Sequence, residues 1–188
     1  MTEIEHPDVS RRGSFVARSQ LLSTDDVARA LRRMAHEILE RNNHDERLVV
    51  IGLQTGGVAF AKQLTDELNR IGTSSVPLGS LDVAFYRDDL SLNPIRDAST
   101  TSIPVDLNGR TVILVDDVLF TGRTIRAALN ALAEWGRPTS IQLVVMVDRG
   151  HRELPIRPDF VGKNLPTSHS EAIVATLDGV WIGSEERP

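Results

Sequence analysis

The sequence predicts an α/β fold built on a doubly wound, mostly parallel sheet. Residues 48–53, 111–115 and 141–147 are largely apolar and rich in β-branched side chains, as is typical of strands buried on both faces of such a sheet. The first two segments each lead through a short run containing Thr and Gly into a segment with helical character. Strands that alternate with helices in this way form βαβ units, whose ligand sites lie at the carboxyl ends of the strands.

The N-terminal part is predicted to be an arm followed by a helix. Residues 1–20 show no sustained period, and we expect a mobile N-terminal arm there. A helix begins after Ser23 or Thr24, either of which can cap it, because two aspartates occupy its first turn and apolar residues then repeat at helical spacing. This helix should end near Asn42 and Asn43.

The second βα unit carries a loop of small residues. The strand over 48–53 is followed by Gln54, Thr55, Gly56 and Gly57, and then by a helix that extends to about residue 70. Another strand is expected over 76–85. Residues 86–102 are polar and include Asn93-Pro94, so they form a long excursion of the kind found in lids and binding loops. We expect this loop to be flexible.

The stretch from 111 to 132 is the most informative part of the chain. Its apolar strand runs directly into Asp116 and Asp117, and a turn then opens a helix over 125–132. The turn offers backbone N–H groups, hydroxyls and the positive end of a helix dipole, which together form an anion site: Thr121, Gly122, Arg123 and Thr124. Since the two acids repel a phosphate, their partners are hydroxyl groups or a metal ion near the same ligand. A ribose 5-phosphate satisfies both requirements.

Other interpretations of this stretch stay open from the residues alone. Strand, turn and capped helix recur in α/β proteins, and Thr121 or Thr124 could simply cap the helix. An acid pair after an apolar strand also occurs in phosphate-accepting receiver domains, but these place the pair near the start of the chain and lack this turn. The sequence contains no G-x-x-x-x-G-K-[ST] loop and no G-x-G-x-x-G after a strand.

The C-terminal part contributes one more core strand and a long connector. Residues 141–147 form the fourth predicted strand, residues 148–170 a connector with several Pro and Gly, and residues 174–177 a short last strand. We expect one domain over residues 21–188, because 188 residues suffice for one core and no repeat or low-complexity tract divides them.

The composition is that of a soluble globular protein. Hydrophobic residues make up 40% and charged residues 25% of the chain, and no apolar run approaches the length that spans a membrane. With a polar N-terminus as well, a cytoplasmic location is expected. The absence of cysteine excludes disulfides, zinc held by cysteine and thiol catalysis. The net charge of −5 argues against a broadly basic surface, so any RNA site must be a local patch.

Residues 112–124 resemble the phosphoribosyl pyrophosphate binding motif of type I phosphoribosyltransferases. Longer strings resemble the PyrR family of bifunctional pyrimidine operon regulators with uracil phosphoribosyltransferase activity: residues 86–90, 136–138, 147–157, 162–164 and 166–168. The resemblance covers roughly residues 21–178. It implies the type I phosphoribosyltransferase fold, a sheet flanked by helices with a small hood and a flexible loop.

The reaction that this resemblance implies is attack of uracil on phosphoribosyl pyrophosphate, giving uridine monophosphate (UMP) and pyrophosphate. Asp116 and Asp117 would contact the ribose diol, and residues 121–124 the 5-phosphate. Catalysis needs positioning, stabilisation of the leaving group and exclusion of water more than a protein nucleophile. Mg²⁺ would arrive with the phosphoribosyl pyrophosphate, and we assign no dedicated metal site to the protein.

Two loops would handle the leaving group. Residues 54–57 occupy the place of the family's pyrophosphate loop, but Gly56 stands where the family often has an arginine. The flexible catalytic loop would contain Tyr86, Arg87, Asp88 and Asp89, and we expect Arg87 to supply part of the missing positive charge unless it is a solvated loop residue.

The base would lie under a hood formed by the connector. The resemblance places Asp148, Arg149, Phe160, Val161 and Gly162 there, with backbone groups of residues 160–162 reading the edge of the pyrimidine. A surface loop stiffened by Pro155 and Pro158 would account for these residues equally well.

An RNA site is expected on the first helix and the connector. Arg33 and His36 lie on one side of that helix, a pattern that a solvated basic face would explain equally well. The resemblance to the family's RNA-contacting segment favours binding of a pyrimidine-operon mRNA leader, with UMP controlling transcription attenuation, through Arg33, His36, Arg41, Arg157 and Lys163. His151 and His169 lack metal-ligand spacing. Self-association into a homo-oligomer is also expected.

Two other functions stay open. One is a catalytically weak or inactive RNA regulator that keeps the pocket as a nucleotide sensor, which Gly56 makes credible. The other is a phosphoribosyltransferase without RNA control, or one that takes a purine base such as hypoxanthine.

Overall fold

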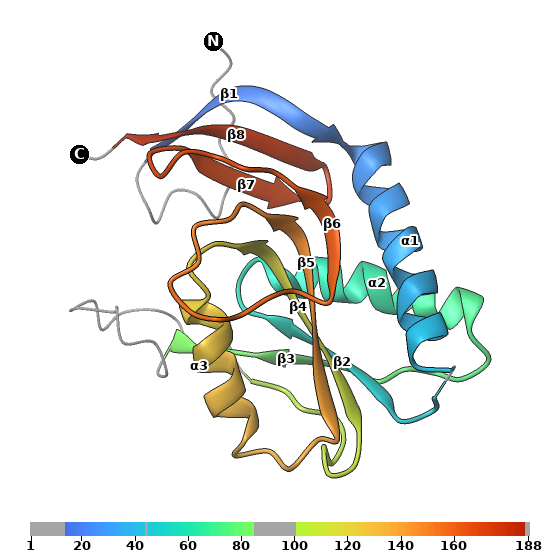
Figure 1. Cartoon of the computed structure of the whole chain (residues 1–188). Helices are drawn as coiled ribbons and strands as arrows, with labels where there is room; N and C mark the ends of the chain where they lie inside the picture. Colours follow the sequence, from blue (N-terminus) through green and yellow to red (C-terminus); the bar gives the residue numbers. More distant parts are fainter. Residues whose placement is uncertain (1–13, 44, 85–100, 187–188) are drawn as a thin grey trace.

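A computed structural model describes residues 14–43, 45–84 and 101–186 (Figure 1). Its main sheet has five parallel strands in the order β3-β2-β4-β5-β6: β2 (Leu48–Leu53), β3 (Leu78–Leu81), β4 (Thr111–Leu119), β5 (Ser140–Asp148) and β6 (Phe160–Asn164). All six residues of β2 and the first six of β4 are buried. The predicted parallel sheet is therefore confirmed, and its three central strands contain the three largely apolar segments of the sequence.

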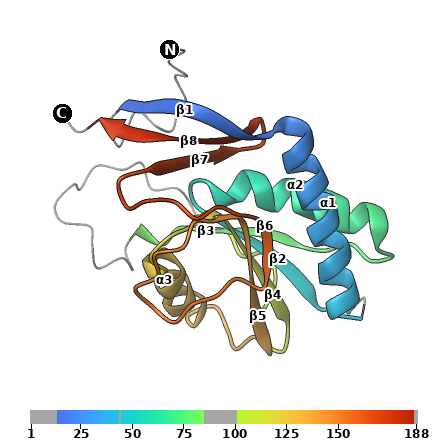
Figure 2. The ribbon, with the colours of Figure 1, turned by 45° about the horizontal axis from the view of Figure 1, so that its top comes forward.

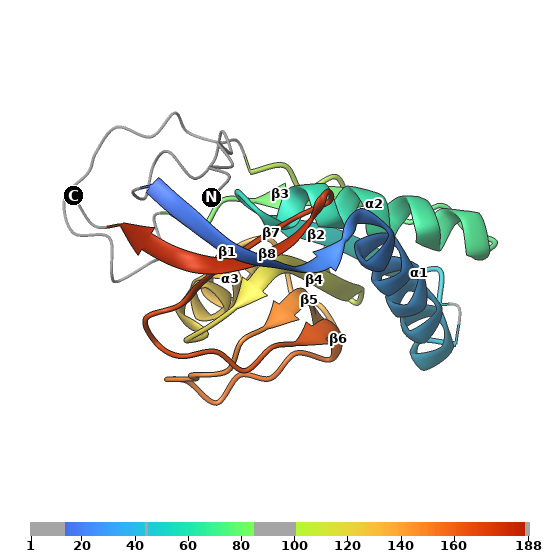
Figure 3. The same cartoon turned by 90° about the horizontal axis from the view of Figure 1, so that it is seen from above.

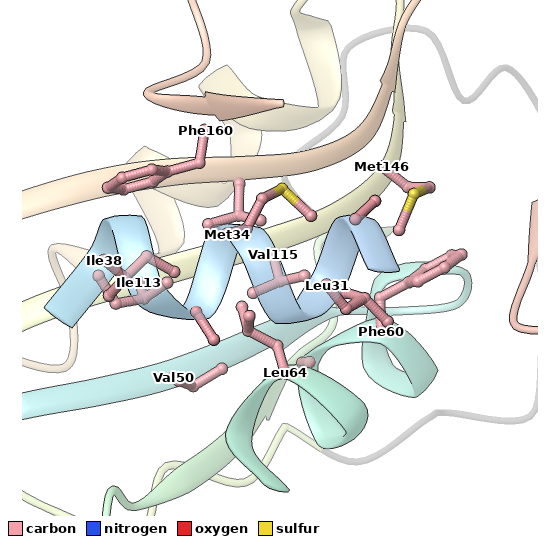
Figure 4. Packing of buried hydrophobic residues seen from close by; sticks show 14 of the residues in the cluster. Leu31, Met34, Ile38, Val50, Phe60, Leu64, Ile113, Val115, Met146 and Phe160 are labelled. Atoms are coloured by element: carbon pink, nitrogen blue, oxygen red, sulfur yellow. The ribbon is translucent and has the colours of Figure 1, made fainter. Parts of the chain in front are cut away.

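The helices cover both faces of this sheet (Figures 1 and 2). Helices α1 (Thr24–Arg41) and α2 (Gly57–Ile71) pack on one face, where they meet alternate strand residues such as Val50, Ile113 and Val115 (Figure 4). Helix α3 (Arg123–Leu132) packs on the other face against the residues in between, among them Ile51 and Leu114. The two-residue period of the strands thus divides the core into two layers.

The cap of α1 agrees with the sequence prediction. Ser23 is the N-cap residue, and its hydroxyl accepts from the backbone N–H of Asp26 at 3.3 Å while the Asp26 carboxylate accepts from the backbone N–H of Ser23 at 2.9 Å. These bonds lower the pKa of Asp26 to about 2, the side-chain hydrogen bond with Ser23 being the largest cause. The helix ends with Asn42 as its C-cap, as expected.

A second sheet, with three antiparallel strands in the order β1-β8-β7, lies over the carboxyl ends of β4 and β5 (Figure 1), and in the view from above β1 and β8 run across them (Figure 3). Its strands are β1 (Ser14–Ser23), β7 (Ala172–Thr176) and β8 (Gly179–Glu186). The expectation of a mobile arm is therefore wrong for residues 14–20, because pairing with β8 makes them a strand. The predicted last strand is β7, and β8 after it was missed.

Several predicted bounds also change. The strand expected over 76–85 is reduced to β3 within the described residues, and Ser80 forms an antiparallel bridge with Ser102. The connector over 148–170 contains the edge strand β6, which pairs with β5. Most of the expected flexible loop over 86–102 lies outside the described residues. None of the helices in the described ranges combines the length and the apolar character needed to cross a bilayer.

Candidate functional site

The predicted ligand-binding segments meet at the carboxyl edge of the parallel sheet. Strand β2 ends at Leu53 and leads into the loop of residues 54–57, and the neighbouring strand β4 ends at Leu119, before the turn over 121–124. Strand β5, next in the sheet, ends at Asp148, where the connector begins. Three loops that are far apart in the sequence therefore surround one edge, as is usual for ligand sites in open α/β sheets.

The two acids lie within β4 rather than after it. Asp116 is buried, with 7% of its surface exposed, and its position pairs with Val145 of β5. Its Oδ1 accepts a hydrogen bond from the backbone N–H of Asp117 at 3.1 Å, and Asp117 Oδ1 accepts from the N–H of Val118 at 2.7 Å. Backbone donors thus orient the carboxylates. Such fixed, charged oxygens suit the hydroxyl groups of a sugar or a hydrated cation.

The loop of residues 54–57 packs onto these acids through its glycines. A Cβ atom at Gly56 would lie 2.0 Å from Asp117 Oδ2, and a Cβ at Gly57 would lie 2.2 Å from the carbonyl oxygen of Val115. Only glycine allows such close approach of the backbone. The Gln54–Thr55 peptide bond is cis. Residues 54–57 include no positively charged side chain. The negative charge of an anion bound at this loop would therefore have to be offset by groups from elsewhere.

The turn over 121–124 has the geometry of an anion site. Gly122, the N-cap residue of α3, has a φ of 92°, and no side chain caps the helix. The N-cap residue is therefore neither Thr121 nor Thr124, although Thr121 Oγ1 accepts a long hydrogen bond, 3.4 Å, from the N–H of Arg123. The first N–H groups of α3 open at the end of β4, the strand that carries the two acids.

Arg123 is turned toward the connector. Its Nε and one terminal nitrogen lie 2.7 and 2.6 Å from Glu153 Oε2. The backbone N–H groups of Glu153 and Leu154 donate to the carbonyl oxygen of Thr121 at 3.0 and 3.3 Å. These contacts fix the turn against the connector, and they occupy the Arg123 guanidinium with Glu153.

Arg152, which the sequence analysis did not single out, anchors the connector. It forms an ion pair of 2.5 Å with Asp148 and donates to the carbonyl oxygens of Phe120 and Ile156 at 2.7 and 3.1 Å. Its guanidinium therefore ties the end of β5 to the end of β4 and to the connector. In the sequence, its place inside the string over 147–157 that resembles the PyrR family was the only signal.

Arg149 also has a structural role. It is 7% exposed, and it donates to Thr167 Oγ1 at 3.1 Å and to the carbonyl oxygens of Ser168 and Glu171 at 2.9 and 2.6 Å. Its guanidinium lies 4.1 Å from the centroid of the Phe120 ring. Desolvation lowers the pKa of Arg149. Arg149 was predicted as a hood residue, and it holds the segment before β7 over the site.

Two histidines lie beside these residues. The rings of His151 and His169 have centroids 4.0 Å apart, and Phe120 meets both rings edge-on. His151 Nε2 is hydrogen bonded to the carbonyl oxygen of Thr167. Within residues 14–43, 45–84 and 101–186, no three His, Cys, Asp or Glu side chains gather as metal ligands would.

The remaining hood residues lie on β6. Phe160 is 5% exposed and belongs to the core on the side of α1 (Figure 4). Val161 pairs with Val145, the same residue of β5 that Asp116 pairs with from the other side. Residues 160–162 therefore lie level with the first acid, two strands away. Tyr86, Arg87, Asp88 and Asp89 lie outside the described residues.

The predicted RNA residues lie on α1 (Arg33, His36 and Arg41), on β6 (Lys163) and in the connector before β6 (Arg157), and the structure places α1 and β6 side by side (Figure 1). All five are exposed: Arg33, His36, Arg41, Arg157 and Lys163. One terminal nitrogen of Arg33 donates to the carbonyl oxygens of Val161 and Gly162. The arginines of α1 thus lie beside the strand that carries Lys163, although the two elements are far apart in the sequence.

The chain is similar to known proteins over most of its length. The family model of the phosphoribosyl transferase domain matches residues 17–178. The chain is 52% identical to the bifunctional protein PyrR of Chloroflexus aurantiacus over 165 residues, 86% of this chain and 91% of the relative. It is 54% identical to the bifunctional protein PyrR of Streptomyces coelicolor over 172 residues, 88% of this chain and 89% of the relative.

Solved structures show the same fold. The hypoxanthine phosphoribosyltransferase of Trypanosoma cruzi matches with a TM-score of 0.70 and 19% identity, over 90% of this chain and 98% of that one. A hypoxanthine phosphoribosyltransferase from Staphylococcus aureus matches with a TM-score of 0.67 and 18% identity, over 97% of this chain and 98% of that one. At such identities the likeness concerns the fold and not the substrate.

Proposed function

Because the chain belongs to the phosphoribosyl transferase family and, within it, to the bifunctional PyrR proteins, we propose that it transfers phosphoribose to uracil and regulates pyrimidine operon mRNA. The reaction converts uracil and phosphoribosyl pyrophosphate to UMP and pyrophosphate, a pentosyl transfer. The observation that carries the proposal is the meeting of the acid pair, the glycine loop and the start of α3 at one edge of the sheet.

Each part of this edge has a role in the reaction. Asp116 and Asp117 accept from the ribose hydroxyls, and the first N–H groups of α3 with the Thr121 and Thr124 hydroxyls bind the 5-phosphate. Gly56 and Gly57 let backbone N–H groups approach the pyrophosphate. Positioning of the anomeric carbon in this way supplies much of the rate enhancement, since no protein nucleophile is required.

Magnesium enters as part of the substrate complex. Asp116 and Asp117 would suit such a cation, because carboxylates are hard oxygen ligands. When bound with the substrate, the ion would offset part of the charge on the phosphate oxygens. The protein therefore needs to offset only the remaining negative charge of the leaving group, and Arg87 is the residue that we assign to this task.

The base is read at the hood. Peptide groups of residues 160–162 lie level with Asp116, so a nucleotide whose ribose rests on the acids would direct its base toward β6 or the connector. Arg149 and Arg152 contribute by holding the connector in place rather than by touching the base. Backbone donors and acceptors held at fixed positions would then bond to the edge of the base, and this favours the single ring of a pyrimidine over the two rings of a purine.

The regulatory half of the proposal uses the basic surface of α1 and β6. Arg33, His36, Arg41, Arg157 and Lys163 bind phosphates and exposed bases of an mRNA leader. UMP strengthens RNA binding by favouring the RNA-competent state, as thermodynamic linkage requires. Because the proposed ligands are soluble metabolites and mRNA, we propose a cytoplasmic location. We also expect a homo-oligomer.

One specific observation favours a second candidate, an RNA regulator that keeps the pocket only as a nucleotide sensor. The loop of residues 54–57 lacks a cation, and the close contact of Gly56 with Asp117 leaves no room for a larger side chain there. Loss of one stabilising contact in a transition state can reduce turnover by about 100-fold or more. This candidate predicts UMP binding without turnover.

Release of pyrophosphate in the presence of phosphoribosyl pyrophosphate and Mg²⁺ tests the enzyme, with uracil, hypoxanthine, guanine and orotate as bases. We expect turnover with uracil alone. Turnover with a purine would replace the assigned substrate, and binding of UMP without any turnover would favour the sensor.

Binding of a transcript of the leader that precedes the pyrimidine genes in the same genome tests the regulator. We expect an affinity that falls with salt and is lost when Arg33 and His36 are both replaced by alanine. An affinity that the double substitution leaves unchanged would exclude α1 as the RNA site.

A further inference from the structure

Arg33 joins the RNA-facing helix to the backbone of β6. One of its terminal nitrogens donates to the carbonyl oxygens of Val161 and Gly162 at 2.8 and 3.0 Å, and the other donates to Glu37 Oε1 at 2.7 Å. The planar guanidinium makes these three bonds at once, which a lysine ammonium cannot do in the same geometry. The side chain is still 47% exposed, so an RNA phosphate can reach the same group.

Arg41, two turns further along α1, contacts the start of the same strand. Its guanidinium lies 2.8 Å from Asp159 Oδ1 and 5.4 Å from the centroid of the Phe160 ring. Asp159 is itself fixed, because its Oδ2 accepts from the backbone N–H of Leu143 in β5 at 2.8 Å. The position of Arg41 therefore depends on where β6 leaves the connector.

Strand β6 lies between the two proposed sites. On the sheet side, Val161 is level with Asp116, and residues 160–162 are the peptide groups assigned to the base. On the helix side, the carbonyl oxygens of two of these residues accept from Arg33. Hydrogen bonds to one peptide group polarise the next, and a small displacement of the strand changes both of its hydrogen bonds with Arg33 at once.

We infer that Arg33 and Arg41 couple nucleotide binding to RNA binding, because their contacts with β6 and Asp159 make the positions of their guanidinium groups depend on the position of that strand. This inference rests on the proposed function and assigns its regulation to named contacts. A base bound to residues 160–162 fixes their carbonyl groups, which orders the Arg33 guanidinium for RNA, while the Asp159–Phe160 contact holds Arg41 in register. By linkage, RNA bound to the ordered arginines strengthens UMP binding by the same factor.

The experiment measures the factor by which saturating UMP raises affinity for the leader transcript. The Arg33→Lys variant keeps the positive charge for RNA but cannot bond to Glu37 and to both carbonyl oxygens of β6 at once. The control is Arg29→Lys, the same exchange at a residue that pairs with Asp26 inside its own helix. For the wild type we expect a factor within the usual range of about 5 to 150. It should fall to about 1 in Arg33→Lys and stay at the wild-type value in Arg29→Lys.

A second readout needs no RNA. Amide hydrogen exchange over residues 28–41, measured with and without UMP, should show added protection in the wild type and none in Arg33→Lys. If Arg33→Lys keeps the wild-type increase in RNA affinity with UMP, or the added amide protection with UMP, the inference is overturned while the proposed function stands. A wild-type protein that binds no leader transcript in either condition would instead overturn the regulatory half of the proposed function. Loss of RNA binding by Arg33→Lys still leaves the exchange measurement to decide.

Discussion

Replacement of Gly56 by alanine is the sharpest perturbation of the proposed active site. The new Cβ would lie 2.0 Å from Asp117 Oδ2 and 2.4 Å from its Cγ. Ordinary van der Waals contact begins at 3.4 Å, so the carboxylate and the loop must move apart by more than an ångström. Misplacement of a catalytic group by about 1 Å can cost 100-fold in rate. We therefore expect uracil-dependent turnover to fall by about 100-fold in Gly56→Ala.

A double-substitution cycle separates this contact from a general loss of stability. Pyrophosphate release would be measured for Gly56→Ala, Asp117→Ala and the combined variant, with urea denaturation as the control for folding. Since Asp117→Ala removes the atoms that the new Cβ meets, the alanine at position 56 should cost little in that background. Additive losses, or wild-type turnover in Gly56→Ala, would refute the reasoning.

Three further predictions concern stability. The pKa of the Asp26 carboxylate is about 2 in the folded chain and 3.8 ordinarily, so its ionised form stabilises the fold fully above pH 3.8 and this stabilisation is lost as the pH falls through 2. Titration of the carboxylate followed by carbon NMR measures the folded pKa. A titration midpoint near 3.8 would contradict the Ser23 cap. Gln142→Leu should lower the free energy of unfolding by about 1–3 kcal/mol, because the two amides of Asn42 and Gln142 bond reciprocally at 2.8 and 3.0 Å; an unchanged urea midpoint would show otherwise. Arg152→Met should cost about 3 kcal/mol by leaving a half-buried carboxylate unpaired, and equal urea stability would remove its anchoring role.

The core of the fold is readable from the sequence because local pattern and tertiary environment agree there. Residues 48–53 are apolar without interruption, and the structure buries all of them between helices. Ser23 and Asp26 specify the start of α1 through bonds within one turn. Strands β1 and β8 lack this local signal. They come from opposite ends of the sequence and pair in antiparallel orientation. The structure of each strand therefore depends on a partner that a pattern of neighbouring residues cannot reveal.

The candidate site divides in the same way. Asp116, Asp117 and the turn over 121–124 form one local pattern, and it predicts their chemistry directly. The contact between Gly56 and Asp117 needs the neighbouring strand β2 to bring the loop into place. In the same way, the resemblance assigns Arg149 to the hood over the base, whereas folding surrounds its guanidinium with backbone acceptors. Charge type alone does not distinguish these two environments.

Uracil-dependent release of pyrophosphate by Asp117→Asn tests the central claim, that the acid pair within β4 positions phosphoribosyl pyrophosphate. Asp66→Asn is the matched control, because Asp66 lies exposed on α2. We predict turnover by the wild type and by Asp66→Asn, and a loss of about 100-fold or more in Asp117→Asn with folding unchanged. Wild-type turnover by Asp117→Asn would contradict the account.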